Sequence, residues 1–276
     1  MSFIEINQKT CNQCGICADE CPDHLIAFVK GHFPRAIPGS DAICIRCGHC
    51  VAVCPNGSLS HRDEPVEKSP EILENFQVTP EQCEQLLKSR RSVRVFKDQP
   101  VSREIISHLI EDSRYAPTGH NNQEVEWLVI DNKKELERIE DVGTEWFRWN
   151  IKNQTPMAAA FHMEEQMKTQ EKSHNVFLRG APVLIVTHAA IQGGSTMIAQ
   201  IDCAAALSYM DLMANSMGLG TCWAGFILIM ANMFQPMKEA IGLPESQANL
   251  GCMMLGYNKF RYQRIPPRRE PKIIWR

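Results

Sequence analysis

The pattern of apolar and polar positions separates the chain into a long region with regular periodicity and a short one without it. From residue 79 onward, apolar residues recur every three or four positions, as in helices, or run together, as in buried strands. The expected helices are Thr79 to about Arg90, Ser102 to the residue before Pro117, Lys133 to about Asn150, Ile198 to Met217, and about Ile229 to Ile241. The expected strands are Val125 to Asp131, Pro182 to Thr187, a short segment from Thr221 to Phe226, and Leu250 to Gly256. This order predicts an α+β domain with a central sheet covered by helices.

Two local signals add detail to this pattern. Residues 79–82 read TPEQ, a capping box with proline at the first helical position, which predicts a helix start. The segment from Ile198 to Met217 is apolar nearly all round, so we expect a central, buried helix there.

The first 60 residues have no long helical period and contain an internal duplication. Residues 61–78 are polar and include Pro65 and Pro70, which predicts a linker. We therefore expect a small domain over residues 1–60, a linker over residues 61–78 and a larger domain over residues 79–276.

Two in-phase copies of a cysteine motif dominate the small domain. Residues 11–22 read CNQCGICADECP and residues 44–55 read CIRCGHCVAVCP, so each copy is C-x2-C-x2-C-x3-C-P. Three thiolates two residues apart let one loop wrap three corners of an iron–sulfur cubane, and the fourth cysteine ligates the other cluster. The spacing predicts two 4Fe–4S clusters, one on Cys11, Cys14, Cys17 and Cys54 and the other on Cys44, Cys47, Cys50 and Cys21. Metal–ligand bonding should supply most of this domain's stability.

Zinc and disulfide bonds are the alternative uses of these cysteines. Zinc takes four ligands, usually as two separated pairs, and fits these runs of four poorly. Disulfide bonds need an oxidising compartment, and the start of the chain shows no basic region followed by an apolar run. Residues 1–60 resemble the bacterial two-cluster ferredoxins, and the resemblance implies a ferredoxin-like domain over that whole segment.

Composition and charge are those of an ordinary globular protein. The 276 residues are 44% hydrophobic and 22% charged with a net charge of −3, so no global field points to nucleic acid or a membrane. The longest apolar run, Cys222 to Ala231, is too short to span a bilayer. Twelve cysteines without a secretion signal favour a reducing cytoplasm. The four outside the motifs are expected to be small buried hydrophobes, namely Cys83, Cys203, Cys222 and Cys252.

Four segments of the larger domain carry candidate binding chemistry. Residues 89–96 (SRRSVRVF) hold three arginines, whose planar guanidinium groups suit phosphate, although a solvated basic loop would have the same composition. Residues 116–123 (APTGHNNQ) place amides, which can both donate to and accept from a flat heterocycle, in a turn. Residues 220–226 (GTCWAGF) allow the backbone to approach a ring closely. Residues 257–276 carry seven Lys or Arg against one acid, with two prolines and Trp275, which indicates either a charged tail or an ordered arm.

These four segments, in this order, resemble the FMN-dependent nitroreductase family over about residues 79–276. The resemblance implies a nitroreductase-like α+β sandwich, bound FMN and a domain-interlaced homodimer with FMN at the interface. Contacts to the phosphate and polar edge of the flavin are implied for Arg90, Arg91, Ser92, Arg94 and Arg268. Contacts to the ring are implied for Cys222, Trp223, Ala224 and Gly225. The segment that reaches the flavin of the other subunit is matched by Pro117, Thr118, Gly119 and Asn121.

The resemblance implies an FMN-dependent oxidoreductase in which two 4Fe–4S clusters pass electrons to FMN for reduction of a small nitroaromatic or quinone-like substrate. The expected donor is an external protein such as ferredoxin, or NAD(P)H. Two alternatives remain open: a flavin dehydrogenase or reductive dehalogenase-type member, and a non-catalytic iron–sulfur/flavin relay to a partner protein. Catalytic residues are left unassigned: His120, Tyr115 or Cys222 could donate a proton near the flavin, but a structural role explains each of them better.

Overall fold

The structure is a computed structural model that describes residues 2–173, 175–190 and 196–276. It divides into two compact units, which are described separately. The smaller unit comprises the chain up to Gln77 together with His120–Asn122, and the larger comprises Val78–Gly119 and Gln123–Arg276. Within these described ranges, no helix is both long and apolar enough to cross a membrane.

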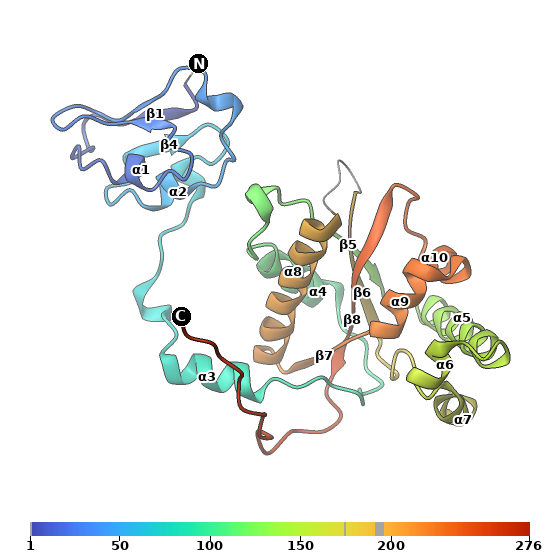
Figure 1. Cartoon of the computed structure of the whole chain (residues 1–276). Helices are drawn as coiled ribbons and strands as arrows, with labels where there is room; N and C mark the ends of the chain where they lie inside the picture. The colour runs from blue at the N-terminus through green and yellow to red at the C-terminus, as the bar shows by residue number, and fades with distance from the viewer. Residues whose placement is uncertain (1, 174, 191–195) are drawn as a thin grey trace. The chain divides into compact units, whose positions relative to one another are not determined.

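The smaller unit consists of two short antiparallel strand pairs and two single-turn helices (Figure 1). Its elements are β1 (Ile4–Ile6), α1 (Ile16–Asp19), β2 (Ile26–Ala27), β3 (Arg35–Ala36), η1 (Ser40–Ala42), α2 (His49–Ala52), β4 (Leu59–His61), η2 (Val66–Lys68) and η3 (Glu74–Phe76). β1 pairs with β4, and β2 pairs with β3. β4 ends at His61, and the smaller unit extends to Gln77, so it includes most of residues 61–78, which were expected to form a linker. The small core includes Cys17 and Cys50 from the two motif copies.

A four-stranded antiparallel sheet forms the centre of the larger unit (Figure 1). Its strands are β5 (Glu126–Ile130), β6 (Val183–Ala190), β7 (Leu219–Trp223) and β8 (Gln247–Tyr257). Their order across the sheet is β5-β6-β8-β7. β6 is buried along nearly its whole length, which explains its unbroken apolar sequence.

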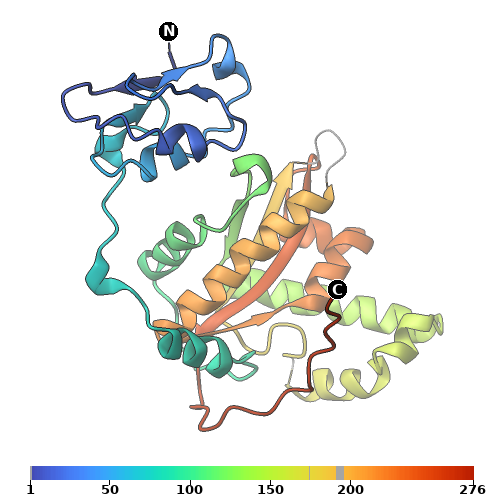
Figure 2. The same ribbon diagram turned by 60° about the vertical axis from the view of Figure 1, so that its left-hand side comes forward.

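Helices cover both faces of this sheet (Figures 1 and 2). The helices of the larger unit are α3 (Pro80–Ser89), α4 (Arg103–Ser113), α5 (Lys133–Lys152), α6 (Pro156–Ala160), α7 (Met163–Ser173), α8 (Thr196–Ser216), α9 (Gly225–Met233) and α10 (Gln235–Ile241), whereas η4 (Gly119–Asn121) lies mostly in the stretch that belongs to the smaller unit. α4 and α8 share a core with Val183 and Ile185 of β6. α5, α9 and α10 share another core with Leu184 and Val186. Successive residues of β6 therefore point to opposite faces and into two separate cores.

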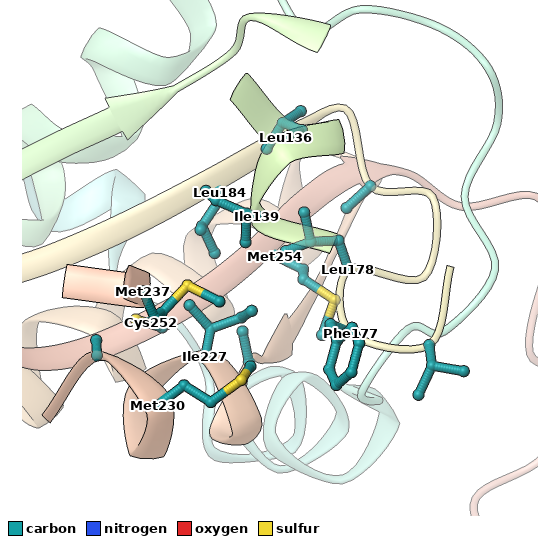
Figure 3. Packing of buried hydrophobic residues seen from close by; sticks show 14 of the residues in the cluster. Leu136, Ile139, Phe177, Leu178, Leu184, Ile227, Met230, Met237, Cys252 and Met254 are labelled. Carbon is teal, nitrogen blue, oxygen red and sulfur yellow. The ribbon is translucent and has the colours of Figure 1, made fainter. Parts of the chain in front are cut away.

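Sulfur-containing side chains fill much of the second of these cores (Figure 3). Met230, Met237, Cys252 and Met254 lie among aliphatic and aromatic side chains there. Methionine is unbranched and polarizable, so it fits irregular gaps between helices and a sheet. Cys203, Cys222 and Cys252 are buried as expected, whereas Cys83 is exposed on α3 and the expectation for it was wrong.

The expected helices and strands occur, with three differences in the second half of the chain. The short strand expected from Thr221 to Phe226 is β7, which ends at Trp223, and Gly225 and Phe226 already belong to α9. The single helix expected from about Ile229 to Ile241 is two helices, α9 and α10. Phe234 leaves the helical region with φ −130° and ψ 107°, and Pro236 has no N–H to continue the earlier helix. α6 and α7 were not expected, because α7 reads MEEQMKTQEKS and has little apolar periodicity.

Within the single chain, α8 is buried on one side only, although its sequence is apolar nearly all round. Cys203, Leu207 and Met210 are buried against the sheet. On the other side, Ile201 and Tyr209 are 60% and 45% exposed. The sequence conceals this asymmetry because both sides of the helix are apolar.

Candidate functional site

Four cysteines line one cavity of the smaller unit. This first cysteine group takes three members from the first motif copy and one from the second: Cys11, Cys14, Cys17 and Cys54. In the described part of the chain, no three or more His, Cys, Asp or Glu side chains are arranged to hold a single metal ion. The four thiols surround a hollow instead, which is the donor arrangement that a cubane requires.

The other four motif cysteines, Cys44, Cys47, Cys50 and Cys21, form a second cysteine group. Burial, followed by the charges of the other three thiols of this group, raises the pKa of Cys50 to about 12. In the first group, burial and then the other three thiols raise the pKa of Cys17 to about 11. The structure thus brings together the two sets of four that the motif spacing predicts.

Hydrogen-bond donors point at these sites. The backbone N–H groups of Leu25 and Ser58 donate to Sγ of Cys21 and Cys54, at 3.3 and 3.1 Å. The Ser58 hydroxyl lines the first cavity, is buried, and has no hydrogen-bond partner among the described residues. Buried hydroxyls are normally paired, so a cluster sulfide in this cavity would satisfy it. The residues present therefore fit a 4Fe–4S cluster.

In the larger unit, the arginine-rich segment of residues 89–96 runs beside β7. The Val93 N–H donates to the Thr221 carbonyl at 2.8 Å, and Ser92 forms a parallel bridge with Thr221. Gly220 permits this approach, because a Cβ at that position would lie 2.5 Å from Val93 Cγ2. This parallel pairing places Arg94 at the C-terminal end of β7, where Ala224 and Gly225 follow the strand.

A pocket at this end of β7 collects five of the predicted flavin-binding residues. They are Arg94, Cys222, Trp223, Ala224 and Gly225. A Cβ on Gly225 would meet no atom within 4 Å, so the backbone there faces open space. The pocket volume is about 260 Å³, slightly below the range of about 300–1,000 Å³ that is typical of small-molecule sites.

Arg179 and three phenylalanines also line this pocket and were missed by the sequence analysis. The phenylalanines are Phe161, Phe177 and Phe226. Phe226 meets Phe161 edge-on with ring centroids 5.4 Å apart. An apolar, aromatic wall beside two guanidinium groups suits a flat ring that carries an anion.

A buried carboxylate holds the loop that carries Phe177 and Arg179. Glu140 of α5 accepts hydrogen bonds from the backbone N–H groups of Leu178 and Phe177, at 2.6 and 3.4 Å. It also accepts one from Gln170 Nε2 of α7 at 3.1 Å. No local sequence signal could have identified Arg179, because its position depends on this contact between distant segments.

Arg90 is engaged outside the pocket. Its Nη1 lies 3.3 Å from Oδ2 of Asp211 on α8, and the Thr221 hydroxyl donates to the same carboxylate. Burial raises the pKa of Asp211, while Thr221 and Arg90 lower it. Arg90 therefore neutralises a buried carboxylate that the sequence analysis did not single out.

The other residues predicted to contact FMN are not among the described residues that line the pocket at the end of β7. The Gly119 N–H donates to both carboxylate oxygens of Asp202, at 3.1 and 3.2 Å, which places this glycine against α8. The other residues in this category are Arg91, Ser92, Pro117, Thr118, Asn121 and Arg268. From Lys259 onward the C-terminal arm is exposed and forms neither helix nor strand.

Cys222 is the proton-donor candidate that lies in the pocket. Burial raises the pKa of its thiol, whereas the Arg94 and Arg179 guanidinium groups lower it. The thiol contacts the Trp223 carbonyl at 3.7 Å. Tyr115 is exposed and does not line the pocket.

Comparisons with known proteins agree with this division of the chain. The model of the nitroreductase family matches residues 87–257, and the model of the 4Fe–4S dicluster domain matches residues 10–59. A protein of Archaeoglobus fulgidus, named provisionally as an NADH dehydrogenase/NAD(P)H nitroreductase, is 23% identical over 179 residues, covering 65% of this chain and 87% of its own. The NAD(P)H-dependent FMN reductase of Bacillus subtilis is 26% identical over 187 residues, covering 65% and 67%.

Solved structures share the fold of the larger unit. A nitroreductase with bound FMN from Bacteroides fragilis has a TM-score of 0.55 at 21% identity, over 69% of this chain and 97% of its own. One with bound FMN from Desulfitobacterium hafniense has a TM-score of 0.54 at 22% identity, over 70% and 96%. These similarities confirm the expected α+β sandwich.

Proposed function

Because the chain belongs to the nitroreductase family and carries an N-terminal 4Fe–4S dicluster domain, we propose that it is an FMN-dependent oxidoreductase supplied with electrons by two 4Fe–4S clusters. The proposed acceptors are small nitroaromatic or quinone-like compounds, and the proposed donor is a ferredoxin-type protein or NAD(P)H. The observation that carries the proposal is that one chain holds two groups of four cysteines and a pocket with aromatic walls and two arginines.

Each proposed cofactor has its own residues. The first and second cysteine groups would each hold one cluster. Arg94 and Arg179 would hold the FMN phosphate or the polar edge of the ring, and Trp223, Ala224 and Gly225 would line the ring. When bound, FMN supplies the hydride or electron transfer, while these residues place the cofactor and exclude water from it.

We further propose that the protein is a homodimer whose subunits complete each other's flavin sites. The pocket of one chain is slightly small for a complete site. The outer side of α8 is an exposed apolar stripe made by Met197, Ile198, Ile201 and Tyr209, and such a surface marks an interaction site. A second subunit would cover this stripe and contribute residues 117–121 and the arm with Arg268.

The experiment that tests the proposal is anaerobic purification followed by stopped-flow reduction. The protein should contain FMN and about eight irons and eight labile sulfides per chain. NADH, NADPH and reduced ferredoxin are then mixed in turn with the protein, and a nitroaromatic or quinone is added. Turnover with at least one donor supports the enzyme. Flavin reduction without oxidation by any small acceptor favours the relay, and stoichiometric zinc without sulfide rejects the clusters.

Arg94 tests the flavin pocket separately. Arg94→Ala should weaken FMN binding by about 1.5–3 kcal/mol, the contribution of a hydrogen bond to a charged group. Arg148→Ala is the matched control, because it removes an exposed arginine on α5. Both variants should keep their iron. Equal FMN affinity in the two variants, measured by fluorescence titration, would show that Arg94 does not contact the cofactor.

A further inference from the structure

His61 is a buried imidazole in the smaller unit to which the proposed function gives no role. It is the last residue of β4, pairs with Ile4 of β1 and is only 2% exposed. Its ring packs beside Phe3, with 5.4 Å between the ring centroids. In this position its Nε2 lies 3.6 Å from Sγ of Cys44, a member of the second cysteine group.

The contacts of the other ring nitrogen of His61, Nδ1, show which of the two ring nitrogens carries the proton. Nδ1 faces two backbone donors, the N–H groups of Asp63 at 3.0 Å and Glu64 at 3.3 Å. A nitrogen that accepts hydrogen bonds has a free lone pair and no proton, so the proton of this ring is on Nε2. The imidazole therefore directs an N–H at the Cys44 sulfur.

In the first motif copy, the position equivalent to His61 holds a phenylalanine, Phe28. An offset of 33 residues relates Cys11 to Cys44, Gly15 to Gly48 and Leu25 to Ser58, and the same offset relates Phe28 to His61. The Phe28 ring packs on Gly15, where a Cβ would lie 2.4 Å from its Cε1. A phenylalanine side chain cannot donate a hydrogen bond. The two copies therefore differ in whether the residue at this position can donate to a cysteine sulfur.

We propose that His61 sets the reduction potential of the cluster held by the second cysteine group, by donating its Nε2–H to the Cys44 thiolate. The inference rests on the proposed function, because it requires a cluster on these cysteines. A hydrogen bond to a ligand sulfur withdraws negative charge from the cluster. It therefore stabilises the reduced form, which carries one more electron, and raises the potential. His61 acts through Cys44 and is a positioning residue.

The test is a potentiometric titration of the full-length protein followed by EPR, with iron and sulfide determined first. His61→Phe places the residue of the first copy in the second, and it should lower one of the two midpoint potentials and leave the other unchanged. If His61→Phe changes the equilibrium constant for electron exchange between the two clusters tenfold, the difference between their midpoint potentials changes by about 59 mV. His61→Gln, whose amide can still donate, should show a smaller shift.

Ser58→Ala is the matched control, because its hydroxyl lines the other cavity. This variant should shift the midpoint that His61→Phe leaves unchanged. If His61→Phe retains eight irons and both midpoints stay the same, or both fall equally, the inference is wrong. If the wild-type protein holds no clusters, the proposed function fails together with this inference. If the clusters are present but the midpoints do not respond to His61→Phe, only this inference fails.

A second measurement covers the case in which His61→Phe does not fold. Protein labelled with 15N-histidine and carrying His49→Gln, which removes the imidazole next to Cys50 in sequence, is examined in the reduced state by electron–nuclear double resonance. A 15N coupling to one cluster is expected from the His61 N–H···S contact. Absence of any coupling would overturn the proposal without use of a His61 variant.

Discussion

Asp211 is a buried carboxylate whose charge depends on a single arginine. Its side chain is only 10% exposed, and Arg90 lies 3.3 Å away. We expect Arg90→Ala to lower the free energy of unfolding by about 1–3 kcal/mol, because the carboxylate loses its compensating charge. Arg90→Ala combined with Asp211→Asn should recover much of this loss, since a neutral amide needs no counter-charge. Urea unfolding of the three proteins measures both effects.

The loss of stability in Arg90→Ala should depend on pH, and the direction of the Asp211 pKa shift determines how. Burial raises the pKa of Asp211, against the lowering effects of Thr221 and Arg90. The folded protein therefore binds this proton more tightly than the unfolded chain, and the group's contribution to stability falls as pH rises through the raised pKa. Removing Arg90 raises the pKa further. The stability difference between Arg90→Ala and wild type should thus grow, and not shrink, as pH rises from about pH 5 to about pH 8. A difference that is equal at both pH values would contradict this account.

Among the elements, β7 positions the arginine-rich segment through Gly220. In Gly220→Ala, the new Cβ would lie 2.8 Å from Val93 Cβ, which cannot rotate away, and close to the Asn258 amide, which can. We expect the segment to move away from β7, with a loss of about 1–3 kcal/mol in stability and weaker FMN binding. The iron content should not change. Adding Val93→Gly, which removes that Cβ, should restore FMN binding in part, and unaltered FMN affinity in Gly220→Ala would show that the contact is not needed.

The elements that were predicted correctly are those specified by neighbouring residues. The start of α3 depends on a capping box within four residues, and β6 depends on its own apolar run. The break between α9 and α10 was missed although Pro236 is visible, because Phe234 and the surrounding residues continue the apolar period. Arg179 reaches the pocket only through Glu140, about forty residues earlier in the chain. Contacts of this kind have no local signature in a single sequence.

For the whole molecule, the apolar stripe on α8 predicts that stability of the assembly and FMN binding change together. Ile201, on this stripe, is 60% exposed in the single chain. Ile201→Glu would place a charge in the proposed subunit interface, so sedimentation should show monomer, and FMN should be lost. Trp149→Glu is the matched control, because Trp149 is an exposed apolar residue of α5, on the other face of the sheet. A dimer that persists in Ile201→Glu would place the interface elsewhere.

Because the two units belong to one chain, we expect the proposed electron transfer between them to be fast, since tethering holds a donor at high effective concentration near its acceptor. The residues predicted to link the two units, 61–78, include Pro65 and Pro70, which would restrict the space that such a linker samples. We expect Cys54→Ala, which removes a thiol of the first cysteine group, to leave FMN bound and reducible by dithionite. Flavin reduction by a ferredoxin-type donor should slow by on the order of a hundredfold, because the tethered path is interrupted.

Cys83→Ala is the control, since Cys83 is an exposed cysteine on α3 outside both groups. Anaerobic flavin bleaching is compared with each donor after EPR has confirmed loss of the cluster. Equal rates in the two variants with the ferredoxin-type donor would mean that the clusters and the flavin do not form one electron path.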